Sequence, residues 1–108
     1  YEVESVKVEY GDGGSHAIVK LKKNGEIKIG ESKGNGPVDA TIKAVKSIVG
    51  QLCHLEEFLV QAVTGGSDDL GKVHIQVSNK GAFYYGFGAD TDIVIATAKA
   101  YVDAINKL

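Results

Sequence analysis

One segment of the sequence, Gly34-Asn35-Gly36-Pro37-Val38-Asp39, carries the clearest chemical signal. A G-x-G sequence before a helix leaves the backbone bare, so its N–H groups can approach an anion closely. The second half has its own version before a predicted helix, Gly86-Phe87-Gly88-Ala89-Asp90-Thr91. The residues alone favour two tight turns, and the alternative is a site for a small carboxylate ligand. The third glycine and the parallel βαβ unit of a dinucleotide fingerprint are missing, which argues against nucleotide binding.

The histidines and the cysteine indicate no catalytic or metal site. His16, His54 and His74 form neither an H-x-H nor an H-E-x-x-H pair. We expect His74 to be a solvated strand residue. Cys53 adjoins His54, but a catalytic Cys–His pair is assembled in space rather than by adjacency, so we expect Cys53 to be a small buried side chain. We therefore predict no catalytic residue, no metal and no cofactor in this chain.

Acidic residues cluster at Glu56-Glu57, at Asp68-Asp69 and around Asp90 and Asp92. Catalytic carboxylates need a cleft and contrasting environments. Most of these residues fall at predicted strand edges and turns, where solvated charge is the ordinary state. Asp90 and Asp92 precede a predicted helix, which indicates capping and a favourable interaction with the helix dipole.

Composition excludes several classes of protein. The chain has 108 residues, 12 basic and 14 acidic, with a net charge of −2. This balance argues against a nucleic-acid partner, which normally meets a basic patch. No apolar run reaches the ~18 residues of a transmembrane helix, so we expect no membrane partner. A lone cysteine fits a reducing compartment, and we expect a cytoplasmic protein. Because no initiator methionine is present, we expect a fragment of a longer chain.

The sequence contains an internal repeat of one unit. A shift of 56 residues aligns 16–52 with 72–108 without a gap, and Gly25, Gly30 and Val38 then meet Gly81, Gly86 and Val94. In each half, period-2 alternation predicts three short strands, and Asn24-Gly25 is typical of a hairpin turn. Helical spacing follows at Val38, Ile42, Val45, Val49 and Leu52, and again at Val94, Ala98, Tyr101, Ile105 and Leu108.

These patterns predict an α+β fold: two fused βββα units related by an internal pseudo-twofold, with layered antiparallel sheets and two helices. The units cover about 1–53 and 54–108 of a single domain, 1–108. The segment 55–63 is apolar on both faces, with Phe58, Val60 and Ala62 on one and Leu59 and Val63 on the other. Extra burial under the helices, or a subunit interface or ligand pocket, would account for it, and we expect a homodimer.

Three segments resemble, in order, the C-terminal regulatory domain of 2-isopropylmalate synthases: GNGPVDA (34–40), AVTGGSDDLGKV (62–73) and GFGADTDIVIATAKAYVDAIN (86–106). The resemblance covers nearly the whole chain. Citramalate synthases carry the same type of domain. The GNGPVDA segment and the T-D-I-x-x-A-x-A-K-A ending are more similar to the isopropylmalate enzymes.

The resemblance implies a parent acyltransferase that condenses acetyl-CoA with 2-oxoisovalerate in leucine biosynthesis. Its chemistry would occur in an N-terminal TIM barrel that uses a divalent metal. The C-terminal domain would pair with its twin in a homodimer and bind leucine near the dimer interface as a feedback inhibitor. The chain itself would then be a regulatory domain without enzymatic activity, attached to the catalytic barrel.

The resemblance also assigns effector contacts to individual residues. Many relatives have tyrosine where this chain has Phe58, so a hydrogen bond from that hydroxyl is absent here. Together the implied effector residues are Gly34, Asn35, Gly36, Pro37, Val38, Asp39, Leu55, Phe58, Ala62, Leu70, Ala89 and Thr91.

The physics of these residues suits an amino acid. Two helix starts can offer N–H groups to a carboxylate, and Asp39 or carbonyl groups can accept from the ammonium. Val38, Leu55, Phe58 and Ala62 can line a pocket for an isobutyl group. Leucine and isoleucine differ only in a methyl position, typically ~1–3 kcal/mol, so both effectors remain open. A dimerisation module that binds no metabolite is the second interpretation.

Overall fold

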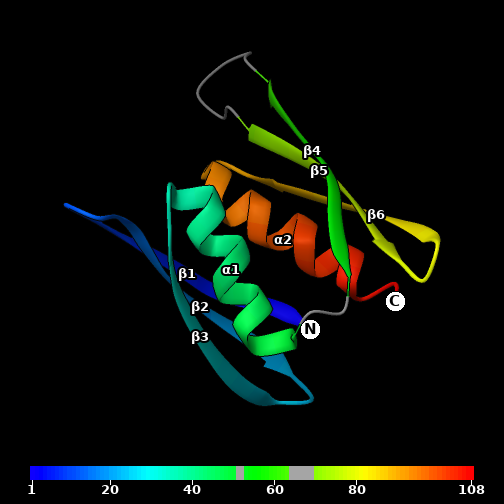
Figure 1. Cartoon of the computed structure of the whole chain (residues 1–108), viewed down its shortest axis with the longest axis horizontal. Coiled ribbons are helices and arrows are strands. Elements are labelled where there is room, and N and C mark those ends of the chain that lie inside the picture. Colours follow the sequence, from blue (N-terminus) through cyan, green and yellow to red (C-terminus); the bar gives the residue numbers. More distant parts are fainter. Residues whose placement is uncertain (51–52, 64–69) are drawn as a thin grey trace. The chain divides into compact units, whose positions relative to one another are not determined.

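The computed structural model describes residues 1–50, 53–63 and 70–108, apart from the side chains of Ala62 and Val63. The chain divides into two compact units, Tyr1–Gly50 and Gln51–Leu108, each with the order strand–strand–strand–helix (Figure 1). The predicted βββα repeat and the α+β class are confirmed, and the pseudo-twofold between the units stays a prediction. The elements are β1 (Glu2–Gly11), β2 (Gly14–Lys23), β3 (Glu26–Gly34), α1 (Pro37–Val49), β4 (His54–Val63), β5 (Leu70–Asn79), β6 (Ala82–Asp90) and α2 (Ile93–Ile105).

Each unit holds an antiparallel sheet whose second strand is central, in the orders β1-β2-β3 and β4-β5-β6. The registers correspond, because Val19 pairs with Gly30 and Ile75 with Gly86. Asn24 and Lys80, which begin the two tight hairpin turns, both adopt positive φ, at 51° and 52°. Such φ values suit the primed turns that join twisted strands. The internal repeat is therefore a repeat of backbone geometry.

Both sheets bury the face toward their own helix. On the central strands, Val19 and Val73 are fully buried. Thr41 and Thr97, equivalent buried helix residues, each donate a hydroxyl hydrogen bond to the carbonyl four residues earlier, at 2.7 and 2.8 Å. Neither helix in the described ranges has the length and apolar character needed to cross a membrane.

The predicted helical stripes are largely confirmed. Val38 and Val49 are half-buried. Leu108 is wrongly predicted, because α2 ends at Ile105 and Leu108 is exposed beyond it. Leu52 lies outside the described residues. The stripe residues that are buried are Ile42, Val45, Val94, Ala98, Tyr101 and Ile105.

Glycines on the third strand of each unit bring the helix backbone against the sheet. A Cβ at Gly30 would collide with the carbonyl oxygen of Ala44, and a Cβ at Gly86 with that of Ala100. Only glycine allows two backbones to approach this closely. As a result α1 packs mainly on β3 and β2, and α2 on β6 and β5.

Gly86→Ala is expected to destabilise the fold by about 1–3 kcal/mol, the usual cost of overpacking a tight site. The added Cβ would meet the Ala100 carbonyl and the Ala104 backbone nitrogen, neither of which belongs to a flexible side chain. Gly11→Ala is the control, because a Cβ at Gly11 meets nothing within 4 Å. Urea unfolding of both variants measures the difference, and equal midpoints would contradict the close-approach role of Gly86.

Candidate functional site

The start of α1 is built from the glycine-rich segment singled out in the sequence. Gly34 ends β3, Gly36 is the N-cap with φ −155° and ψ 176°, and Pro37 occupies the first helical turn. Pro37 is favourable there because its fixed φ suits a helix and its missing N–H would have no partner. No side chain caps this helix. The Val38 and Asp39 N–H groups of its first turn therefore have no side-chain acceptor.

Asp39 holds this turn in place. Its Oδ2 accepts a hydrogen bond from the Asn35 backbone N–H at 3.0 Å and contacts Lys43 Nζ at 3.0 Å. The hydrogen bond from Asn35, and then Lys43, lower the pKa of Asp39 below its usual value. The sequence suggested that Asp39 could accept from a ligand ammonium. In the structure its Oδ2 is already engaged by the protein, which makes Asp39 a positioning residue for the turn.

The glycines of this segment differ in what they do. A Cβ at Gly34 would meet the Ala40 backbone nitrogen at 2.5 Å and Asp39 Oδ2 at 2.6 Å, so Gly34 serves internal packing. A Cβ at Gly36 would meet nothing within 4 Å. Gly36 is therefore the position of this turn where backbone lies open to a ligand.

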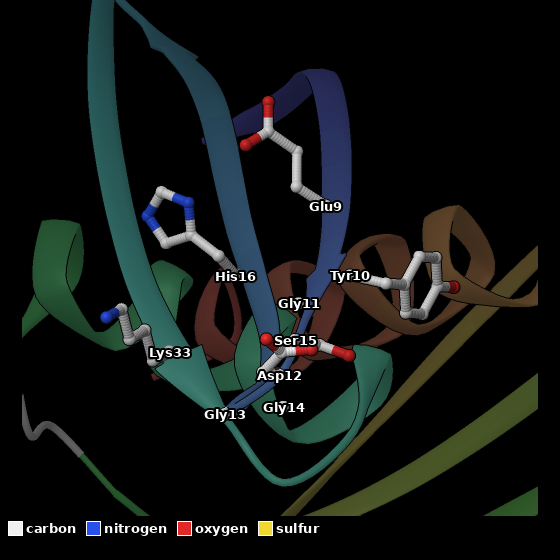
Figure 2. Close-up of a pocket in the computed structure, with 9 residues that line it drawn as sticks. All are labelled: Glu9, Tyr10, Gly11, Asp12, Gly13, Gly14, Ser15, His16 and Lys33. Carbon is white, nitrogen blue, oxygen red and sulfur yellow. The ribbon is translucent and has the colours of Figure 1, made fainter.

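An open pocket lies beside this segment, at the β1–β2 turn (Figure 2). It is lined by residues 9–16 and Lys33, and none of the predicted effector residues is among them. His16 Nε2 lies 3.7 Å from Glu31 Oε2 at its rim. The lining holds the acidic Glu9 and Asp12 as well as the basic Lys33, so charged groups of both signs face the pocket. We assign no ligand to it.

In the second unit, β4 brings two of the predicted residues onto one face. Leu55 pairs with Val77 and Phe58 with Ile75, and both partners are buried on the helix side of β5. A bulge between Leu55 and Glu57 keeps Leu55 and Phe58 on the same side. Both are half-buried and form part of an apolar wall. Ala62 continues this register opposite Gly71, but its side chain lies outside the description.

The other predicted residues of this unit lie elsewhere. Leu70 pairs with Val63 and Ala89 with Lys72, and strand alternation assigns both to the face of the sheet away from α2. Thr91 is exposed in the turn before α2, with its hydroxyl 3.5 Å from Asp90 Oδ1. The unit therefore does not gather Leu70, Ala89 and Thr91 with Leu55 and Phe58.

The start of α2 differs from that of α1. Asp92 is its N-cap and accepts from the Val94 N–H at 2.8 Å, so the predicted capping role of Asp92 is confirmed. Asp90 accepts from the Asp92 N–H at 3.0 Å and from Lys99 Nζ at 2.9 Å. The hydrogen bond from Asp92, followed by Lys99, lowers the pKa of Asp90. The protein's own carboxylates occupy the place where a ligand carboxylate was expected.

The second G-x-G is also not a turn. Gly86 and Gly88 lie inside β6, and a Cβ on either would collide with α2 backbone. The sequence suggested that both G-x-G segments open helices, which is wrong for this one. Helix docking, rather than access to an anion, requires these glycines.

The remaining reactive side chains are structural. Cys53 is buried as predicted, with Sγ 4.0 Å from Tyr101 Oη. Burial, and then the nearby Cys53, raise the pKa of the Tyr101 hydroxyl above its usual value. His74 is exposed as predicted, and its ring lies 4.9 Å from that of Phe87. The ranges that the structure describes hold no group of three His, Cys, Asp or Glu able to bind a metal ion.

Comparison with known proteins decides the family. A family model described as "LeuA allosteric (dimerisation) domain" matches residues 1–108. The chain belongs to the LeuA allosteric (dimerisation) domain family.

The relatives of this LeuA domain are named 2-isopropylmalate synthase. That of Parabacteroides distasonis is 49% identical over 108 residues, which cover 98% of this chain and 22% of the relative. That of Chromobacterium violaceum is 44% identical over 110 residues, covering 100% and 21%. That of Heliobacterium modesticaldum is 42% identical over 92 residues, covering 85% and 18%. The LeuA domain thus spans about one fifth of the length of these relatives.

The carboxylates at the helix starts predict acid-sensitive stability. Because folding lowers the pKa of Asp39 and Asp90 below 3.8, their stabilisation is present above that value and is lost as pH falls through the lowered one. The melting temperature should therefore drop as pH falls from about 5 to about 2.5. Asp39→Asn should make this drop smaller, whereas Asp12→Asn, at an exposed turn position, should leave it unchanged. An identical pH profile for Asp39→Asn and the unmodified protein would contradict the role of Asp39.

Proposed function

We propose that this domain is the leucine-binding, feedback-regulatory and dimerisation domain of a cytoplasmic 2-isopropylmalate synthase. The observation that carries the proposal is the uncapped start of α1 at Gly36, in a chain whose whole length matches the LeuA family. The names of the relatives favour leucine biosynthesis over the citramalate branch.

The ligand carboxylate binds the first-turn N–H groups of α1 in this proposal. The positive end of the helix dipole favours an anion there, and Gly36 presents no side chain in its way. Asp39 and Lys43 hold the turn in the conformation that exposes these groups. Carbonyl groups, rather than the engaged Oδ2 of Asp39, accept from the ammonium.

The isobutyl group of leucine lies against apolar side chains. The half-buried Val38 supplies apolar surface in the first turn of α1, beside the N–H groups that bind the carboxylate. Burying a leucine side chain contributes about 1.5–3 kcal/mol. In the second unit, the half-buried Leu55 and Phe58 form an uncharged wall on β4, and because Phe58 has no hydroxyl this wall offers shape rather than a hydrogen-bonding group.

The condensation of acetyl-CoA with 2-oxoisovalerate belongs to another part of the parent protein in this proposal. The described residues offer no fitting ligand set for the divalent metal that the family implies. The chain therefore acts on the reaction through effector binding and through its connection to a catalytic barrel.

Leucine is expected to bind the chain and stabilise it against heat. At 100 times its dissociation constant a ligand adds about 2.7 kcal/mol, which shifts the melting temperature by several degrees for a domain of this size. Calorimetric titration with leucine, isoleucine and valine identifies the effector. Binding of isoleucine alone would place the chain in the citramalate branch. Binding of none would favour a dimerisation module.

Gly36→Val is expected to abolish the leucine-induced shift while leaving the unliganded melting temperature nearly unchanged. The valine side chain has room in the unliganded structure, because a Cβ at Gly36 meets nothing within 4 Å, but it would cover the first-turn N–H groups. Gly11→Val, at another uncrowded glycine, should retain the full shift. Normal leucine binding by Gly36→Val would move the carboxylate site elsewhere.

The chain alone is expected to release no free CoA from acetyl-CoA and 2-oxoisovalerate with magnesium or manganese. A thiol-reactive dye measures the release, after correction for the single cysteine. A heat-treated sample is the control. Release above that control would contradict the assignment of the chemistry to another part of the parent protein.

A further inference from the structure

The first strand of each unit extends beyond the helix that covers the other two. Gly30 and Gly86 dock the helices on the third strands. Consequently α1 packs on β3 and β2, with few contacts to β1, and α2 packs on β6 and β5. The helix-side face of β1 is therefore left largely uncovered by α1, and that of β4 by α2.

On β4 this face is apolar and accessible. Val60 pairs with Val73, so both point to the helix side of the sheet. Val73 is 0% exposed, whereas Val60 is 42% exposed. Leu55 and Phe58, on the same side, are half-buried. Of the two acidic residues in this stretch, Glu57 alternates to the other face, and Glu56 lies in the bulge and accepts a hydrogen bond from the Ser78 hydroxyl at 2.6 Å.

β1 repeats this arrangement in the first unit. Val6 pairs with the fully buried Val19, and Val8 with the fully buried Ala17. Val6 and Val8 are nevertheless only half-buried. Lys7 and Glu9 alternate to the opposite face. An uncovered apolar strip on the helix side of the first strand is thus a property of both units.

We propose that these two strips, Val6 and Val8 on β1 and Leu55, Phe58 and Val60 on β4, are the surface that a second copy of this chain covers. The proposal rests on the homodimer of the proposed function and adds where its interface lies. An apolar, uncharged strip suits a twofold contact, because the same strip on the partner is its natural complement. The family description, a dimerisation domain, identifies the partner as a second copy.

The backbone favours contact through these faces rather than through the strand edges. β1 carries a bulge between Val3 and Ser5, and β4 carries one between Leu55 and Glu57. A bulge disturbs the ladder of an edge strand and discourages the addition of another strand. The partner is therefore expected to pack on side chains instead of extending either sheet.

The opposite face of the second sheet is the competing surface. Leu59, Phe83, Tyr85 and Phe87 are exposed there. In the first unit the corresponding face carries the exposed Ile27 and Ile29, but it also carries charged side chains, among them Lys7, Glu9, Glu31 and Lys33. The helix-side strips are uncharged in both units, which favours them as the interface.

Two neighbouring residues of β4 provide a matched test. Val60 and Leu59 have similar exposure, 42% and 52%, but point to opposite faces of one strand. In sedimentation equilibrium, Val60→Lys should weaken dimerisation at least tenfold, and Leu59→Lys should leave it within twofold of the unmodified chain. Val8→Lys, in the other unit, should act like Val60→Lys. A dimer that tolerates Val60→Lys and Val8→Lys, or one that Leu59→Lys dissociates, would overturn the proposal.

Footprinting of the unmodified chain decides the question if a lysine variant fails to fold. Photoactivated carbene labelling above and below the dimer dissociation constant should show Val60 and Val8 protected in the dimer only, and Leu59 and Tyr85 labelled equally. Equal labelling of Val60 and Val8 would overturn the surface. If the unmodified chain is monomeric throughout, the homodimer of the proposed function fails as well. If the dimer is stable but these strips are not protected in it, only the proposed location of the interface is wrong.

Discussion

The close approach of each helix backbone to the third strand of its unit, where glycine leaves no side chain, determines how the helix covers its sheet. At Gly30 and Gly86 the helix lies so near the sheet that a single Cβ would collide with it. This contact draws each helix toward the third strand and leaves the first strand beyond its cover. The apolar faces of β1 and β4 are the consequence. The proposed contact with a second copy would use these faces, which the packing at the two glycines leaves uncovered.

The two units share a backbone but not the chemistry of their helix starts. α1 begins at Gly36 with no side-chain cap, while α2 begins at Asp92, whose carboxylate already accepts from the helix. Asp39 and Asp90 both bind a backbone N–H and a lysine, although they sit at different positions of the repeat. In α1 this bracing holds the turn while the N–H groups stay open. The repeat therefore offers one helix start to an anion, rather than two.

The proposals for ligand binding and for subunit contact both use the apolar wall on β4. Leu55 and Phe58 belong to the predicted effector wall and also to the strip that continues at Val60. A ligand and a partner subunit that both contact this strip would use the same side chains. The two proposed roles of the domain thus depend on one strand, held in register by its bulge and by the buried residues of β5.

The sequence by itself determined the repeat, the order of elements, the hairpin at Asn24-Gly25 and the capping by Asp92, because these depend on residues close in the chain. It also predicted the two faces of 55–63 from alternation. Tertiary structure alone decided what each glycine does: Gly36 lies open, whereas Gly86 and Gly88 lie under a helix. It likewise decided that Val60 is accessible although it faces the helix side, and that Leu70 and Ala89 face away from Phe58. The physical reason is that the sequence alone does not distinguish an accessible glycine from one packed under a helix. Whether the backbone at a glycine is open to a ligand or in contact with another backbone depends on where a helix distant in the sequence packs.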